Sequence, residues 1–501
     1  MDSVTLTLNG VVTTMSLDAF SKKLTANACV GTKCASDVAS AAALDNLWLV
    51  FGGVMVFIML LGFGLLEIGC CSVKNTKHIL FRNLSDLCLT GLTFYAVGYA
   101  FLFGDGNVFI GRTGFFLQGD TFHTDIPMAY EGYEYGNWFF QWAIAAVAVT
   151  IFSGAVAERI TLGAYLAYTL CVSAVIYPVA GHWIWSTTGW ASVLRTPQDR
   201  LFEVGTIDFA GCGCIHMLGG ISALIGCIFL GPRKGRFHSD GSHDELPKQS
   251  VLYQSMGTLI LWFGWYGFNC VSTVSLRGDL SHVMTKVAVN LTLGACMGGV
   301  CTVLLDRLVG SKSWDVCMFN NGILAGCVSV TGSCSVIEPE GAVALGAIAS
   351  LVYVGVAKLV LRCKIDDVVD AIPVHFGCGT LGALAPGFFA SGKGVAMAVG
   401  SGSCGVFYRC DGHQGHQLAA QVVYVLAIFA WVAGFCTLLF GLLSKLGLLR
   451  VSADAEATGL DAYEHGGSAY TFEPAPTSRV LDTSMHKTSL ESDAPRDTTT
   501  S

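Results

Sequence analysis

Long apolar runs separated by short polar segments dominate the chain between residues 46 and 448. A helix needs about 20 consecutive apolar residues to cross about 30 Å of hydrocarbon. The pattern therefore predicts an all-α polytopic membrane protein with eleven transmembrane helices. They are expected at residues 46–70, 84–104, 137–157, 162–185, 207–230, 250–275, 284–305, 315–335, 341–363, 372–391 and 417–448.

Polar segments flank this predicted membrane domain of residues 46–450. Residues 1–45 are mixed in character and lack the pattern of a cleavable signal, so they are expected to form an N-terminal segment outside the membrane. From Val451 the chain becomes rich in Asp, Glu, Ser, Thr and Pro. Residues 451–501 are therefore expected to form an accessory tail, disordered from about residue 474.

Basic residues are distributed unevenly between alternate loops. One set of loops contains Lys74, Lys77, Arg82, Arg159, Arg233, Lys234, Arg236, Lys248, Arg307, Lys312, Arg362, Lys364 and Arg450. The other set contains only Arg112, Arg195, Arg200, Arg277, Lys393 and Arg409. Because short cytoplasmic loops carry an excess of Lys and Arg, this bias predicts an extracellular N-terminus and a cytoplasmic C-terminus.

Composition excludes two broad classes of protein. Only 13% of the 501 residues are charged and 53% are apolar, whereas about a quarter of an ordinary soluble domain is charged. A net charge of −8 also argues against a nucleic-acid partner, because such proteins are usually basic. Most of the 20 Cys lie in apolar runs, but the pairs Cys29/Cys34 and Cys404/Cys410 lie in polar segments where disulfides could form.

Seven ionisable residues lie in or beside the predicted spans. An ionisable group in a membrane helix is a functional hypothesis by default, with a buried structural contact as the alternative. The seven are Glu67, Glu158, His182, Asp208, His216, Asp370 and His375. His216 in span five and His375 in span ten are both followed by glycines, which favours a paired role, since imidazole can donate and accept hydrogen bonds.

This placement of the two histidines also indicates internal symmetry. The chain divides into two units of five spans, and an odd number of spans forces the units into opposite orientations. We therefore expect two inverted five-helix repeats plus an eleventh helix, with a substrate path at the repeat interface near the midplane.

Aromatic residues gather near two span ends. One group runs from Tyr177 to Trp185 and the other from Trp262 to Phe268, close to Ser272. Aromatic belts at membrane interfaces are common. The alternative is a cation site, because a ring face attracts a small cation by roughly 0.5–2 kcal/mol.

Four motifs in order make the chain resemble the ammonium transporters, the Amt, Mep and Rh group, from about Leu47 to Tyr470. They are Asp208-Phe-Ala-Gly211 with His216, Trp265-Tyr-Gly-Phe268-Asn269, Asp366-Asp-Val-Val-Asp370 with His375, and Gly459-Leu-Asp461 followed by His465-Gly466 and Ala469-Tyr470. Trp185 and the Asp366 motif place the resemblance closest to the Amt branch.

The resemblance implies a plasma-membrane homotrimer that transports ammonium and methylammonium, with no enzymatic activity, cofactor or metal. It implies an outer ammonium site formed by Trp185, Ser272 and Phe140 and ordered by Asp208, a gate at Phe268, and a pore lined by His216 and His375. Structural or coupling roles fall to Asp370, Asp461 and Tyr470, with a cytosolic regulator as a candidate partner of the tail. Ammonium would lose its proton at the outer site and cross as NH₃.

Two positions depart from the family pattern. Ile144 stands where many members carry Phe, which predicts a gate that lacks its first ring and is less selective. Tyr463 occupies the place of a regulatory Thr in some plant members, so phosphorylation there is not expected. Thr471 and the Ser/Thr-rich stretch after it are the remaining candidates for modification.

Three alternatives stay open at this point. The same scaffold could serve an ammonium sensor, although paired histidines favour transport. An Rh-like gas channel is a second alternative. A membrane enzyme using His216, His375 and Cys214 or Cys378 is a third, but no spacing typical of metal ligands supports it.

Overall fold

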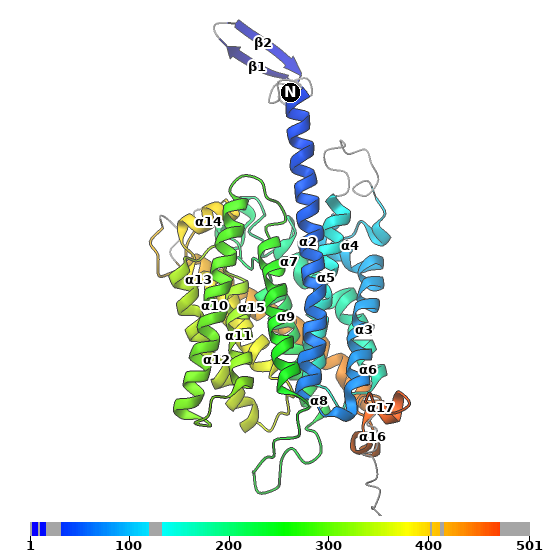
Figure 1. The fold of residues 1–501 in the computed structure, drawn as a ribbon. Coiled ribbons are helices and arrows are strands. Elements are labelled where there is room, and N and C mark those ends of the chain that lie inside the picture. The colour runs from blue at the N-terminus through cyan, green and yellow to red at the C-terminus, as the bar shows by residue number, and fades with distance from the viewer. Residues whose placement is uncertain are drawn as a thin grey trace, which may run out of the picture.

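The computed structural model describes residues 3–8, 11–16, 32–119, 133–400, 403–410 and 415–470. Long helices run side by side through the body of the protein, as Figure 1 shows. Strands β1 (Ser3–Leu8) and β2 (Val11–Ser16) form an antiparallel hairpin before α2 (Thr32–Cys70). The start of α2 and the short helices α16 (Ala453–Thr458) and α17 (Leu460–Glu464) lie at opposite ends of the bundle (Figure 1).

Between these ends the chain is almost entirely helical. The α-helices are α3 (Thr76–Thr93), α4 (Tyr99–Phe103), α5 (Tyr133–Ala155), α6 (Leu162–Cys171), α7 (Tyr177–Trp185), α8 (Leu218–Leu230), α9 (Val251–Val271), α10 (Leu280–Val309), α11 (Val316–Thr331), α12 (Pro339–Arg362), α13 (Cys378–Phe389), α14 (Gly392–Val399) and α15 (His416–Lys445). Wider π-helical turns are η2 (Phe94–Gly98), η5 (Val172–Ile176), η8 (Cys212–Met217) and η9 (Ile372–Gly377). Short 3-10 turns are η1 (Val73–Asn75), η3 (Phe115–Leu117), η6 (Pro197–Asp199) and η7 (Leu201–Glu203).

The predicted membrane character is confirmed. Within the described part of the chain, nine helical segments are long and apolar enough to cross a bilayer. The remaining two predicted spans coincide with α9, which has 21 residues, and α11, which has only 16. The total of eleven spans and the inverted-repeat layout therefore stay predictions.

Helix α3 begins earlier than the predicted span at residues 84–104. Hydropathy placed the start too late because Lys77 and Arg82 interrupt the apolar pattern. Arg82 is nevertheless buried, 3.7 Å from the Glu67 carboxylate, and Asp86 inside the predicted span is also buried and accepts a 2.7 Å hydrogen bond from Thr169. Charged groups that find partners inside a bundle do not end a membrane helix.

Helix α2 likewise begins at Thr32, before the predicted start at residue 46. The stretch before residue 46 is rich in alanine, which has the highest helix propensity of all residues, so the helix continues beyond the apolar run. Of the two candidate disulfides, Cys404–Cys410 is formed. Cys29 lies outside the described residues.

Candidate functional site

The two histidine-bearing segments have the same local design. An Asp lies eight residues before each histidine, at Asp208 and Asp367, and a Gly lies four residues after it. Both histidines stand within a π-helical turn, His216 in η8 and His375 in η9. Because a π-turn is often found at functional positions of a helix, its presence around both histidines marks this pair as the candidate site.

The two segments cross where glycine removes the side chain. A Cβ atom on Gly220 would lie 2.1 Å from the backbone nitrogen of Phe376, and one on Gly379 would lie 2.9 Å from that of Met217. Backbones can approach this closely only at glycine. The crossing brings the two imidazoles together, with 3.3 Å between the Nδ1 atoms of His216 and His375.

Aromatic rings and apolar residues surround the histidine pair. The His216 ring lies 5.4 Å from Trp265 and 5.8 Å from Phe268, and the His375 ring lies 6.4 Å from Phe63. Trp265 is held by a 3.1 Å hydrogen bond from its Nε1 to Thr331. The Nε2 of His216 is buried and has no hydrogen-bond partner among the described residues, so it can bind a small polar molecule.

Asp208 organises the segment that carries His216. Its carboxylate accepts hydrogen bonds from the backbone N–H groups of Cys212, Gly213 and Cys214, at 2.6, 2.8 and 3.3 Å. It also accepts a 2.9 Å bond from the Tyr424 hydroxyl. These four donors use the carboxylate as a cap for the first turn of η8, which fits the predicted ordering role of Asp208.

Trp185 and Ser272, which the family resemblance assigns to one site, line a common cavity of about 270 Å³. We call it the outer cavity after the membrane side on which the loop charges place it. The Trp185 indole donates a 2.9 Å hydrogen bond to the carbonyl of Asp208, and the Ser272 hydroxyl donates a 2.8 Å bond to the carbonyl of Phe268. Ile144 lines the same cavity. The structure thus brings both residues beside the segment that carries His216.

The two predicted phenylalanines are placed differently from each other. Phe268 is fully buried and lies one turn before Ser272 on α9, with its ring next to His216. Phe140 is also fully buried but is not among the residues lining the outer cavity, where Phe103 and Phe209 supply the additional rings.

A second outer cavity of about 180 Å³ adjoins the first and shares Phe103 and Asn137 with it. Asp105 and Glu134 line this second cavity. Carboxylates beside a cleft raise the local concentration of cations. The outer entrance is therefore favourable for a small cation.

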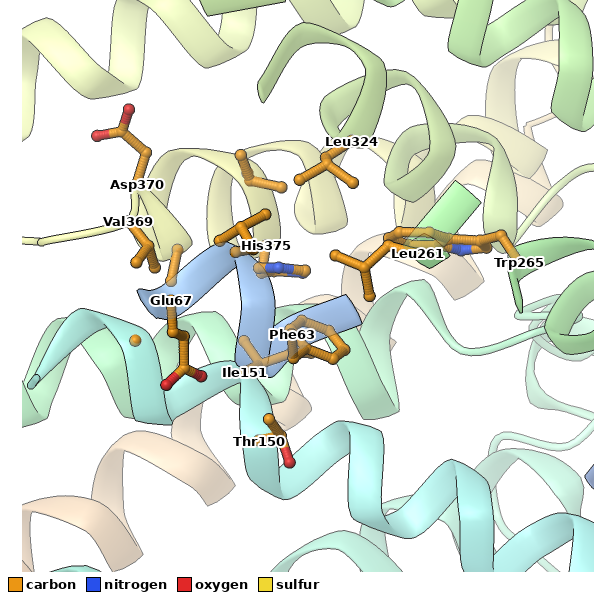
Figure 2. Close-up of a pocket in the computed structure, with 14 residues that line it drawn as sticks. Phe63, Glu67, Thr150, Ile151, Leu261, Trp265, Leu324, Val369, Asp370 and His375 are labelled. Atoms are coloured by element: carbon orange, nitrogen blue, oxygen red, sulfur yellow. The ribbon is translucent and has the colours of Figure 1, made fainter. Parts of the chain in front are cut away.

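A small cavity of about 20 Å³, room for a water-sized molecule, lies on the other side of His375. Figure 2 shows Trp265 at one end of this cavity, His375 and Phe63 in the middle, and Glu67 with Asp370 at the other end. Asp370 accepts hydrogen bonds of 2.8 Å from Tyr353 and 3.0 Å from Asn321. It also lines a larger polar cavity of about 200 Å³, so the histidine pair lies between two cavities.

An ion cluster holds the loop before η9. Arg233 contacts Asp366 at 2.8 Å and Glu158 at 2.9 Å, and Arg159 donates to the Asp366 carbonyl at 2.5 Å. Burial acts to raise the pKa of Asp366, but hydrogen bonds and charge from Arg233 outweigh it and lower this pKa to about 2. The cluster fixes the start of the second histidine segment.

The remaining two predicted residues belong to the tail. Asp461 accepts a 3.0 Å hydrogen bond from the backbone N–H of His78, in the first turn of α3. The Tyr470 hydroxyl accepts a 2.5 Å bond from Gln249. Both therefore tie the tail to the ends of membrane helices, far from the histidine pair, while Thr471 and the segment from residue 474 lie outside the described residues.

Sequence reasoning missed several residues of this site. Asp367 is the positional counterpart of Asp208 and accepts a 2.6 Å hydrogen bond from the Ile372 backbone N–H, but the sequence analysis assigned it no role. Counting back eight residues from each histidine would have identified it. Phe209 of the outer cavity stands inside the Asp208 motif but was assigned no role, and Asn137 and Gln141 were assigned none either, so all three were recognised as lining residues only from the fold.

Comparison with known proteins gives a consistent result. The profile of the Ammonium Transporter Family matches residues 47–470. "Ammonium transporter 1 member 3" of Solanum lycopersicum is 38% identical over 439 residues, covering 85% of this chain and 93% of that protein. "Ammonium transporter 1 member 1" of Arabidopsis thaliana is 40% identical over 414 residues, covering 81% of each.

Solved structures agree with these relatives. A structure described as "Sensor Amt Protein" matches with a TM-score of 0.74 at 33% identity, covering 85% of this chain and 98% of that chain. Mep2 of Candida albicans matches with a TM-score of 0.71 at 26% identity, covering 82% and 86%. The relatives are named as ammonium transporters, and the family match extends from the first membrane helix to residue 470 of the tail. The chain therefore belongs to the ammonium transporter family, on its Amt branch.

Proposed function

We propose that this chain recruits NH₄⁺ at its outer cavity, releases a proton there and conducts NH₃ past His216 and His375. The observation that carries the proposal is the closely spaced imidazole pair between an aromatic outer cavity and a polar inner one. Family membership supports ammonium as the substrate. It also supports a homotrimer in the plasma membrane, with the N-terminus outside and the tail in the cytosol.

The outer cavity suits a small hydrogen-bonding cation. The Trp185 ring offers its face, and the Ser272 oxygen can accept a hydrogen bond while its proton is donated to the Phe268 carbonyl. Asp105 and Glu134 add negative charge nearby. These contacts replace part of the hydration that the cation loses.

Beyond Phe268 the surroundings favour the neutral molecule. A charged ion in a narrow apolar path costs several kcal/mol, whereas NH₃ needs only a few hydrogen-bond partners. The His375 ring lines a space that fits a water-sized molecule, and the buried Nε2 of His216 has no hydrogen-bond partner among the described residues, so both imidazoles can supply such partners. A proton left at the outer site either returns outside or follows a separate route, which decides whether transport is electrogenic.

Voltage-clamp recording of oocytes that express the full chain tests this proposal. External ammonium and methylammonium are applied at several pH values, beside an Asp208→Ala variant at matched surface expression. Electrogenic transport predicts a saturable inward current that the variant loses, whereas uptake of labelled methylammonium without current would indicate electroneutral passage. The absence of both current and uptake, with the protein present at the cell surface, would contradict transport.

A sensor is the second candidate function. The observation favouring it is the similarity to the "Sensor Amt Protein" structure, at 33% identity and a TM-score of 0.74. A sensor needs the outer site but no flux past the histidines. Ammonium binding to the purified protein, together with no uptake in the oocyte experiment, would favour this alternative.

A further inference from the structure

The tail docks onto the start of α3 through the chain's own polar groups. The Leu460 backbone N–H donates a 2.9 Å hydrogen bond to the Asn75 side chain, and Asp461 caps the His78 N–H. These two contacts hold α17 against the first turn of α3. They bring Glu464, the last residue of α17, and His465, which follows it, beside the His78 imidazole.

Three ligand-type atoms converge at this contact. The Nδ1 of His78 lies 3.1 Å from the Nε2 of His465 and 3.3 Å from a carboxylate oxygen of Glu464. All three atoms lie within 4.8 Å of one another. Two ligands about 2.0–2.1 Å from a tetrahedral Zn²⁺ ion are roughly 3.3 Å apart, so the observed spacings match those of a zinc site.

We propose that His78, Glu464 and His465 bind a Zn²⁺ ion that fastens the tail to the membrane domain. The ligands would be Nδ1 of His78, Nε2 of His465 and the Glu464 carboxylate. Two imidazoles and one carboxylate form a donor set that zinc accepts. A water molecule can take the fourth position, because the Glu464 side chain is 26% exposed and His465 is half-buried.

Hydrogen bonding alone satisfies this cluster less well than a dication does. His78 is fully buried, and its Nε2 has no hydrogen-bond partner among the described residues, so its polar contacts are made through Nδ1. A single proton on Nδ1 can serve either Glu464 or His465. A metal ion would engage all three groups at once, and the Phe81 ring, 5.3 Å from that of His465, helps to orient this ligand.

Such a site would couple tail docking to zinc. His78 and His465 are 387 positions apart in the sequence, so the ion would join α3 to the residue that follows α17 in the tail. Zinc that binds only the docked tail stabilises docking by mass action. Removal of zinc would then loosen the tail without altering the pore residues.

Zinc titration of the full-length protein tests the proposal. Protein purified in detergent and stripped with a chelator is titrated with Zn²⁺ against a chromophoric competitor. We expect one tight site per chain, and His78→Asn, Glu464→Gln and His465→Ala should each weaken binding at least about tenfold. His238→Asn is the matched control, because His238 also pairs with a carboxylate, Asp244 at 3.0 Å, but is exposed and has no third ligand beside it.

Two further readouts separate a metal site from a simple tail contact. Co²⁺ should give the visible absorption of a tetrahedral centre in wild type and His238→Asn but not in His78→Asn. Zinc should also slow proteolysis of the tail in wild type but not in His78→Asn. Elution of the variants at the wild-type volume shows that they are folded. Wild type without stoichiometric zinc binding, or His78→Asn with wild-type affinity, would overturn the proposal.

Discussion

The segments that carry His216 and His375 share a plan but differ in their surroundings. Each has an Asp eight residues before the histidine, a π-helical turn around it and a Gly four residues after it. The first segment borders the aromatic outer cavity. The second lies between the water-sized cavity and the larger polar cavity of about 200 Å³. One backbone arrangement therefore positions both imidazoles, while the residues around each segment differ. The outer cavity has aromatic rings and nearby carboxylates that suit a cation, and the inner cavity is lined by polar and charged side chains.

Substitution at the crossing should have the largest effect. Gly220→Ala places a Cβ atom 2.1 Å from the Phe376 nitrogen and 2.7 Å from the His375 carbonyl carbon, and neither backbone atom can move away easily. We expect little folded protein, measured by fluorescence-detected size exclusion. Gly379→Ala meets the other backbone at 2.9 Å and should lose less.

Gly434→Ala on α15 is the control for this pair, since no atom lies within 4 Å of its added Cβ. It should accumulate like wild type. Equal amounts of folded Gly220→Ala and Gly434→Ala protein would contradict the close crossing.

Exchange of the capping carboxylates ranks second. The carboxylate of Asp208 accepts four hydrogen bonds, and Asp208→Asn replaces one of its two acceptor oxygens by an NH₂ group. Each buried donor that is left unpaired costs about 1–3 kcal/mol. We expect a lower melting temperature and methylammonium uptake reduced at least about tenfold. Asp367→Asn should have a milder effect, and equal losses in both variants would remove the proposed difference between the segments.

The ion cluster before η9 should stabilise the fold equally from pH 5 to 8 and lose its effect only in strong acid. Asp366→Asn should cost about 3 kcal/mol, because it leaves Arg233 buried with a weakened partner. Since the pKa of Asp366 is lowered to about 2, its stabilisation is complete above the unfolded pKa near 4 and is lost only as the pH falls toward 2. Thermal melts should therefore show a constant difference between wild type and variant from pH 5 to 8. A difference that disappears by pH 5 would contradict this assignment.

The smallest expected effect is at the outer cavity. Ile144→Phe adds a ring that narrows this cavity, so uptake of methylammonium should fall relative to that of ammonium by less than about tenfold. Competition uptake of the two labelled substrates measures the ratio. An unchanged ratio and unchanged rates would mean that Ile144 does not loosen the gate.

Long apolar runs predicted the helices well because each run must be shielded from water. They misplaced the start of α3, because Arg82 lies inside that helix and pairs with Glu67, and pairing is a property of the fold and not of a window of sequence. The same limit applies to the site. Motifs led to Trp185, Asp208 and the histidines, whereas Asn137 was recognised only when distant helices met around one cavity.

The proposed function requires the closely spaced histidine pair to form the substrate path. Ammonium flux into proteoliposomes is the decisive measurement, made for wild type and for His216→Ala/His375→Ala reconstituted at equal amounts. We expect the double variant to lose at least about tenfold in ammonium flux, while His238→Asn retains the wild-type rate. Unchanged flux in the double variant, with folding confirmed by its elution volume, would show that the histidines do not form the path.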